Sequence, residues 1–249
     1  MNESIVIITG SAPLAPAAVD TIPDEAIVLA VDGGLDHALA AGVQPSGLIG
    51  DLDSVTEPSL VWAARNATID RHPTDKDQTD TELALAFAVA MTPDRLMLVG
   101  GGDRLDHTIA ALGALGAPAL TSIPTIEAWW GDQHVRVIHG PGAASLELVP
   151  GSTLSLLALH GTCRAVSISG VRWPLDEVEL APVVGHGVSN EVGDDGVIDV
   201  QLSAGVLTVF DRPRLATDSP PTSAGTAPTT TTATTPTTTS SDDSTETTA

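Results

Sequence analysis

Aromatic residues are scarce in this 249-residue chain: they make up 2% of it, and tyrosine is absent. Apolar residues still reach 42%, so a buried core must consist mainly of Ala, Val, Leu and Ile. A chain of this length can form one large domain or two small ones, each with its own core. The composition is typical of a globular protein.

Positive charge is also scarce. Ten Lys and Arg stand against 32 Asp and Glu, which gives a formal net charge of -22 at pH 7. Nucleic acids and anionic lipid surfaces bind to basic patches, so neither is an expected partner. A polyanionic substrate would need a divalent metal ion to enter a site lined by carboxylates.

The chain has one cysteine, Cys163, which excludes an intrachain disulfide and agrees with the cytosol. The first four residues carry no positive charge, and the apolar run at 5–8 is too short to span a bilayer. We therefore expect a cytoplasmic protein without a membrane anchor.

Both common glycine-rich nucleotide motifs are missing. There is no GxxxxGK[ST], and the glycines at 100–102 do not complete GxGxxG. Phosphates, if they bind, must be held by a metal ion, by scattered glycine backbone and by a few cations.

The N-terminal half alternates between two patterns. Apolar, β-branched runs at 4–9, 26–31, 47–49, 68–72 and 95–99 predict strands, and the segments 15–21, 36–41, 59–65, 81–91 and 108–115 predict helices. This alternation indicates a mostly parallel sheet with helices on both faces. In such sheets ligands bind outside the carboxyl ends of the strands.

From about residue 125 the pattern changes to short strand-like runs separated by Gly and Pro turns, at 126–130, 135–138, 153–159, 166–168, 197–202 and 206–210. Their spacing predicts an antiparallel β-sandwich. We thus expect an α/β protein with a mostly parallel nucleotide-binding domain at 1–124 and a β-sandwich domain at 125–213. Residues 214–249 are rich in Thr, Pro and Ser and are expected to be a disordered tail.

The motif GDLDSV at 50–55 places Asp51 and Asp53 two residues apart, directly after a predicted strand. In an extended segment these side chains point to the same side, and two close carboxylates are stable together only with a cation between them. Further acids follow the other strands: Asp32, Asp77, Asp80, Asp103 and Asp106. The sequence therefore predicts a metal site at this edge of the sheet.

Four of these acids also have a structural alternative. Asp32 could serve a turn, Asp80, Thr79 or Asp77 could cap the helix at 81–91, and Asp106 could cap the helix at 108–115. Caps alone do not explain an acid at every strand end. Lys76 and Arg104 lie inside the acidic clusters, where a cation can orient a carboxylate or bind a phosphate. The joint pattern favours a magnesium–nucleotide site.

A different feature lies in the C-terminal half. Pro174 holds Trp173 in an extended segment, where its ring could stack on a flat cationic ligand. Ser189 and Asn190 supply compact polar groups nearby in sequence, although a turn would explain them equally well.

Five blocks in this order resemble the thiamine pyrophosphokinase family: VDGGLDHAL at 31–39, GDLDSV at 50–55, KDQTDTELAL at 76–85, GGDRLDHTIAAL at 101–112, and GVRWPL followed by GVSNE within 170–191. The resemblance implies transfer of a diphosphate group from ATP to the hydroxyl of thiamine, which gives thiamine diphosphate and AMP. It also implies magnesium as cofactor and a homodimer with thiamine at the subunit interface.

The resemblance further assigns roles to single residues. It implies that Asp51, Asp53 and Asp80 bind magnesium and, together with Arg104 and Asp106, are catalytic. It implies that ATP is bound by Asp32, Gly33, Lys76, Gln78, Thr79, Gly101, Gly102 and His107. Trp173, Ser189 and Asn190 would receive thiamine, and Asp80 is one candidate for the base that takes the thiamine proton.

One position departs from the family pattern: Asp103 precedes Arg104 where the family usually has glycine. An added negative charge there could change the nucleotide or metal preference. Two alternatives stay open. One is a metal-dependent phosphatase with an aspartyl nucleophile, although such enzymes carry it after the first strand. The other is a nucleotide- or thiamine-binding module that has lost catalysis, for which Asp103 is the only support.

Overall fold

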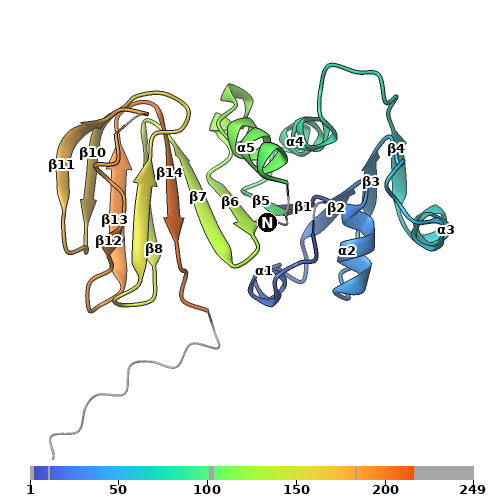
Figure 1. Ribbon diagram of the computed structural model, residues 1–249, viewed down its shortest axis with the longest axis horizontal. Coiled ribbons are helices and arrows are strands. Elements are labelled where there is room, and N and C mark those ends of the chain that lie inside the picture. Colours follow the sequence, from blue (N-terminus) through green and yellow to red (C-terminus); the bar gives the residue numbers. More distant parts are fainter. Residues whose placement is uncertain (1–2, 11, 101–103, 183, 216–249) are drawn as a thin grey trace, which may run out of the picture. The chain divides into compact units, whose positions relative to one another are not determined.

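The parallel strands are six of the ten in one large sheet of the computed structural model, which describes residues 3–10, 12–100, 104–182 and 184–215 (Figure 1). These strands are β1 (Ser4–Ile8), β2 (Ile27–Val31), β3 (Gly47–Gly50), β4 (Thr68–Arg71), β5 (Arg95–Gly100) and β6 (Thr125–Trp130). Their order is β6-β5-β1-β2-β3-β4. Most of them are continuous apolar runs because helices cover both faces of the sheet.

The helices are α1 (Pro16–Asp20), α2 (Gly34–Ala40), α3 (Glu57–Asn66), α4 (Asp80–Ala90) and α5 (Leu105–Ala114), followed by the 3-10 helix η1 (Pro118–Ser122). Alternate residues of β1 pack on opposite faces. Ile5 and Ile7 join a cluster with residues of α4, whereas Val6 and Ile8 join a cluster with residues of α1 and α2. The period of two along each strand thus fixes which helix covers which face.

The remaining strands are antiparallel. They are β7 (Gln133–His139), β8 (Gly142–Glu147), β9 (Thr153–Leu157), β10 (Cys163–Ser169), β11 (Leu175–Leu180), β12 (Asn190–Glu191), β13 (Val197–Leu202) and β14 (Val206–Asp211). β7, β14, β9 and β12 extend the large sheet, and β11, β10, β13 and β8 form a four-stranded sheet. A shared apolar cluster, which includes Leu156, Val166 and Val209, joins strands of both sheets as in a β-sandwich.

The expected fold class is confirmed: a parallel α/β core is followed by antiparallel strands. The sequence pattern missed β8, β11 and β12 as strands because they are rich in small or charged residues or are very short. We expected β6 to be the first of the antiparallel strands, but it pairs parallel to β5. The large sheet is therefore continuous across residues 124 and 125, and the division into domains at that point stays a prediction. None of the helices in the described ranges is long and apolar enough to cross a membrane.

Candidate active site

Two loops at the carboxyl ends of β2 and β3 are tied to each other. The backbone N–H of Leu52 donates to Oδ1 of Asp32 at 3.1 Å, and the N–H of Gly33 donates to Oγ of Ser54 at 3.1 Å. The turn role that the sequence allowed for Asp32 is therefore real, since its φ is 46° and it precedes Gly33, the N-cap residue of α2. Its carboxylate at the same time orients the neighbouring loop.

Gly50 makes this arrangement possible. Its φ is 141°, and a Cβ atom at this position would lie 1.9 Å from Oδ1 of Asp32. Any side chain would displace the Asp32 carboxylate, so the close approach of the two loops requires glycine here.

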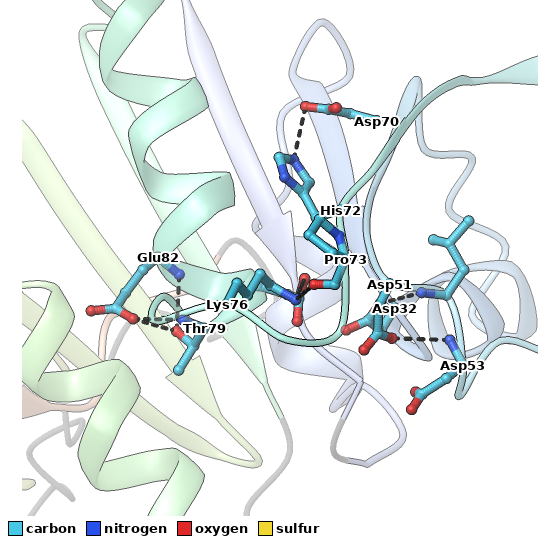
Figure 2. A network of polar contacts seen from close by, with 11 residues as sticks. Asp32, Asp51, Asp53, Asp70, His72, Pro73, Lys76, Thr79 and Glu82 are labelled. Carbon is cyan, nitrogen blue, oxygen red and sulfur yellow. Dashed lines mark hydrogen bonds and ion pairs between the residues drawn. The ribbon is translucent and has the colours of Figure 1, made fainter.

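The carboxylates of Asp51 and Asp53 come to one cavity through a turn, not through the extended segment that the sequence suggested. Leu52 between them has a φ of 68°, and Oδ1 of Asp51 accepts a hydrogen bond from the N–H of Asp53 at 3.1 Å (Figure 2). This hydrogen bond lowers the pKa of Asp51 below its usual value. Asp51 is therefore ionised at neutral pH.

Asp32 has the opposite shift. Its pKa is raised from 3.8 to about 6 in total: burial is the main cause, the hydrogen bond from Leu52 opposes it, and the nearby charges of Asp80, Asp51 and Asp53 add to it. A half-buried carboxylate among other carboxylates is costly unless a cation joins them. The electrostatics around Asp32 therefore favour binding of a cation.

The start of α4 shows which residue caps this helix. Thr79 is the N-cap: its Oγ1 accepts from the N–H of Glu82 at 3.2 Å, while Oε2 of Glu82 accepts from the N–H of Thr79 at 2.8 Å. This reciprocal capping box satisfies the helix start. The alternative that Asp80 caps the helix is therefore wrong, and its carboxylate lies against the same cavity as Asp51.

Lys76 is the cation closest to this acid. Its Nζ lies 3.1 Å from Oδ1 of Asp80 and donates to the carbonyl of Pro73 at 2.9 Å, so it bridges the loop and the helix (Figure 2). Both side chains of the pair are largely buried. Lys76 thus compensates the charge of Asp80 directly, and its charge also helps to lower the pKa of Asp51.

Arg104 and Asp106 form a pair at the start of α5. Nε and Nη2 of Arg104 donate to the two carboxylate oxygens of Asp106 at 3.1 and 2.8 Å. The hydrogen bonds from Arg104 hold the pKa of Asp106 far below its usual range. Because α5 already begins at Leu105, Asp106 lies within its first turn, and the capping role for a helix starting near 108 is wrong.

The cavity at this edge has a volume of about 680 Å³, which falls within the usual range for small-molecule and cofactor sites. It brings together seven of the expected site residues: Asp32, Asp51, Asp53, Thr79, Asp80, Arg104 and His107. Four others, Gly33, Lys76, Gln78 and Asp106, do not line it. Gly101 and Gly102 lie outside the described residues, as does Asp103.

Further lining residues were not singled out from the sequence. Ser54 belongs to the GDLDSV motif, and its hydroxyl beside two acids was the available signal. Thr9, Gly10 and Trp130 also line the cavity. They follow β1 or end β6, and only their position at the carboxyl ends of strands could have indicated them.

The acids fit a magnesium ion that is shared with a nucleotide. Within the described ranges, no three or more His, Cys, Asp or Glu side chains are arranged to hold a metal ion by themselves. Mg²⁺ usually binds to one or two carboxylates together with water and substrate phosphates. Asp51 and Asp53 beside Asp32, whose pKa is raised, supply a donor set of this kind.

The residues expected to bind thiamine form a second group. Nδ2 of Asn190 donates to the carbonyl of Trp173 at 2.7 Å, and Oδ1 of Asn190 accepts from the Trp173 N–H at 3.1 Å. The buried Asn190 thereby fixes the backbone of Trp173, whose side chain is 53% exposed. The guanidinium of Arg172 lies 4.8 Å from the Trp173 ring centre, so this ring face already attracts a cation.

Trp173, Ser189 and Asn190 do not line the cavity that contains Asp32, Asp51, Asp53 and Asp80, which we call the acidic cavity. Ser189 has a φ of 60°, and its N–H donates to Oγ of Ser155 at 3.0 Å. Asn190 belongs to β12 at one end of the large sheet, and seven strands separate it from β3. At about 4.8 Å per strand this spacing amounts to roughly 40 Å before twist is counted.

Comparisons with known proteins agree with this geometry. Residues 20–126 match the family model "Thiamin pyrophosphokinase, catalytic domain", and residues 143–207 match "Thiamin pyrophosphokinase, vitamin B1 binding domain". The thiamine pyrophosphokinase of Bacillus subtilis (strain 168) is 25% identical over 195 residues, which cover 77% of this chain and 90% of that protein.

Solved structures show the same fold. The crystal structure of thiamine pyrophosphokinase from Bacillus subtilis superposes with a TM-score of 0.72 at 24% identity, covering 86% of this chain and all of that chain. Thiamin pyrophosphokinase from Candida albicans gives a TM-score of 0.68 at 13% identity, covering 85% of this chain and 89% of that chain.

The two matched family models place the chain among transferases of the kinase class. The two family models together match well over half of the chain. The catalytic-domain model covers the acids of the cavity, and the vitamin B1 binding model covers Trp173, Ser189 and Asn190. The chain belongs to the thiamine pyrophosphokinase family, whose members are enzymes of thiamine diphosphate biosynthesis. The family resemblance found in the sequence is confirmed.

Proposed function

We propose that this enzyme transfers a diphosphate group from magnesium-bound ATP to the hydroxyl of thiamine, which yields thiamine diphosphate and AMP. The observation that carries the proposal is the acidic cavity, where four carboxylates and Arg104 line a volume suited to a nucleotide. In a chain with net charge -22, a triphosphate can enter such a cavity only with a metal ion.

Transfer of phosphate groups needs alignment and charge neutralisation more than covalent help from the protein. Asp51, Asp53 and Asp80 would hold Mg²⁺, which supplies positive charge to the phosphate oxygens. Asp32 keeps the loop of Asp51 and Asp53 in register through its hydrogen bond to Leu52. The protein's contribution is thus a fixed array of oxygen ligands.

Arg104 is a cation that can reach the phosphates. It lines the cavity, and its pairing with Asp106 is exposed to solvent, so exchanging that partner for a phosphate is inexpensive. Asp106 then acts by orienting the guanidinium, which explains its role although it does not line the cavity. Thr79 and His107 lie on the wall beside the bound nucleotide in this proposal.

We further propose that the enzyme is a homodimer in which one copy supplies the acidic cavity and the other supplies Trp173. The roughly 40 Å between β12 and β3 along the sheet is too far for one thiamine molecule to bridge. Exposed apolar residues adjoin both groups: Leu105 and Ile109 on α5 are 71% and 60% exposed, and Val188 near Asn190 is 46% exposed. A second copy would cover both surfaces.

The reaction is tested by incubating the protein with ATP, magnesium and thiamine, alongside a control without thiamine. We expect AMP and thiamine diphosphate to form in equal amounts and only when thiamine is present. Phosphate release without thiamine would favour the phosphatase alternative, which the placement of Asp51 after β3 instead of β1 already disfavours. Binding of both substrates without product would favour a binding module, and Asp103→Gly would then be the first variant to examine.

The shared site is tested by mixing two impaired variants, Asp53→Asn and Trp173→Ala, and assaying them at a thiamine concentration well below the wild-type KM. If each site takes residues from both copies, random mixing creates dimers in which one of the two sites is intact, and about a quarter of wild-type activity returns. No recovery from a mixture shown to exchange subunits, or a monomer by light scattering, would contradict the proposal.

The cytoplasm is the compartment that we propose, since ATP is abundant there and the one cysteine, Cys163, is buried and free. Fractionation of cells tests this, and recovery of the protein outside the cytoplasm would refute it.

A further inference from the structure

Asp36 is the acid of the VDGGLDHAL block to which the proposed function gives no role. It lies in the first turn of α2, four residues after Asp32, and it does not line the acidic cavity. Its carboxylate is instead bound to the segment that leads from β3 into α3.

Three groups near the start of α3 donate to this carboxylate. The N–H of Thr56 donates to Oδ2 of Asp36 at 3.1 Å, the hydroxyl of Ser59 donates to Oδ1 at 2.6 Å, and the hydroxyl of Thr56 also donates to Oδ1. Burial raises the pKa of Asp36, but the hydrogen bonds from Ser59 and Thr56 outweigh this and hold the pKa below its usual value. Asp36 is therefore ionised at neutral pH and accepts as a charged group.

Asp36 takes the place of an internal cap for α3. Thr56 is the N-cap residue, but within the described residues no backbone N–H of α3 donates to its side chain, in contrast to Thr79 at the start of α4. The Asp36 carboxylate lies at this helix start, where the positive end of the helix dipole favours a negative charge. The start of α3 is thus fixed by a residue of α2.

The contact with Asp36 completes a series along the loop at 51–56. Leu52 and Ser54 bind to the start of α2 through the hydrogen bonds described for the acidic cavity, and Thr56 is the next position that does so. These three positions alternate with Asp51 and Asp53, whose side chains line the cavity. The two acids are therefore held between successive contacts to α2.

Apolar packing also holds this loop. Leu52 and Val55 are buried in a cluster with Leu35 of α2 and Ala63 of α3. Such packing is non-directional, whereas a carboxylate with three donors defines both position and orientation. Asp36 is the directional contact at the end of the loop that is farthest from β3.

We propose that Asp36 is a positioning residue for magnesium binding, because it fixes the end of the loop that carries Asp51 and Asp53. The inference rests on the proposed function. Without the Asp36 carboxylate, the loop keeps its contacts at Leu52 and Ser54 but occupies the binding-competent position for a smaller fraction of the time. The apparent affinity for the metal–nucleotide complex falls by that fraction, while the site formed at saturating magnesium is the same.

The first test measures binding without turnover. The full-length protein is titrated in a calorimeter, without thiamine, with the magnesium complex of an ATP analogue that has a methylene group between its α- and β-phosphorus atoms. We expect Asp36→Ala to weaken binding about fivefold, and Asp36→Asn, which keeps one acceptor oxygen, to weaken it about twofold. Unchanged binding by folded Asp36→Ala would overturn the proposal, and Asp36→Asn decides the matter if Asp36→Ala does not fold.

Ala64→Gly is the control for lost stability. Ala64 is exposed on α3, and glycine in a helix interior destabilises the helix without touching Asp36. Amide hydrogen exchange in the loop at 51–56, measured without ligands, should become faster in Asp36→Ala and stay unchanged in Ala64→Gly. Equal effects of the two variants on exchange and on binding would show that Asp36 acts only through the stability of α3, and would overturn the proposal.

Turnover gives a further readout. Asp36→Ala should raise the magnesium concentration for half-maximal activity about fivefold, with kcat at saturating magnesium within about twofold of wild type. A lower kcat with an unchanged magnesium dependence would contradict a positioning role. Wild-type protein that binds the metal–nucleotide complex and forms no product would refute the proposed reaction, while the exchange and calorimetric comparisons would still decide the role of Asp36.

Discussion

Asp32→Asn is expected to stabilise the protein while it damages the site. In the folded protein the pKa of Asp32 is raised from 3.8 to about 6, so ionisation of this carboxyl opposes folding. At 1.36 kcal/mol per pKa unit the full effect is roughly 3 kcal/mol above pH 6. Because the side chain is only half-buried, solvent screening reduces it, and we expect about 1–2 kcal/mol. Asparagine keeps the oxygen that accepts from Leu52, so the loop contact is retained.

The pH dependence has a definite sign. A carboxyl whose folded pKa is raised binds protons more tightly when folded, so wild-type stability falls as pH rises from 3.8 to about 6. The advantage of Asp32→Asn should therefore be complete above about pH 6 and shrink by more than half at pH 4.5. Urea unfolding at pH 7.5 and pH 4.5 measures both values. An advantage that is absent at pH 7.5, or equal at the two pH values, would refute the reasoning.

Three further variants test the site. Asp53→Asn should lower kcat at least about 100-fold with an unchanged circular dichroism spectrum, because a metal-binding oxygen is lost; near-normal turnover would remove the metal-site argument. Trp173→Ala should raise the KM for thiamine about tenfold and that for ATP little, and an equal rise in both would move Trp173 out of the thiamine site. Lys76→Met should lower the free energy of unfolding of the magnesium-free protein by about 1–3 kcal/mol in urea, because Asp80 loses its partner. Added magnesium should restore part of this stability. A variant whose stability does not respond to magnesium would contradict a metal at Asp80.

The parallel core could be predicted from the sequence because its signals are local. Continuous apolar strands, glycines after them and helical segments between them define the sheet and the edge where ligands bind. The acids at that edge could be found for the same reason, and seven of the expected residues do line one cavity.

Other features depend on contacts between distant residues, which no local pattern records. Thr79 and Glu82 form the capping box of α4, so Asp80 is not the N-cap and lines the cavity instead. Asp51 and Asp53 reach the same cavity through the turn at Leu52 and not through an extended segment. The parallel pairing of β6 was missed because short strands have the same pattern in parallel and antiparallel sheets. The distance between Trp173 and the acids likewise follows from strand order and not from spacing in the sequence.

In the proposed reaction, a diphosphate group passes from ATP to thiamine in one step at the acidic cavity. ATP labelled at its β-phosphorus, incubated with magnesium, thiamine and the full-length protein, distinguishes this reaction from transfer of a single phosphate. The proposed reaction predicts that all transferred label appears in thiamine diphosphate and that the nucleotide product is unlabelled AMP. Label retained in ADP, with thiamine monophosphate as the other product, would contradict the claim.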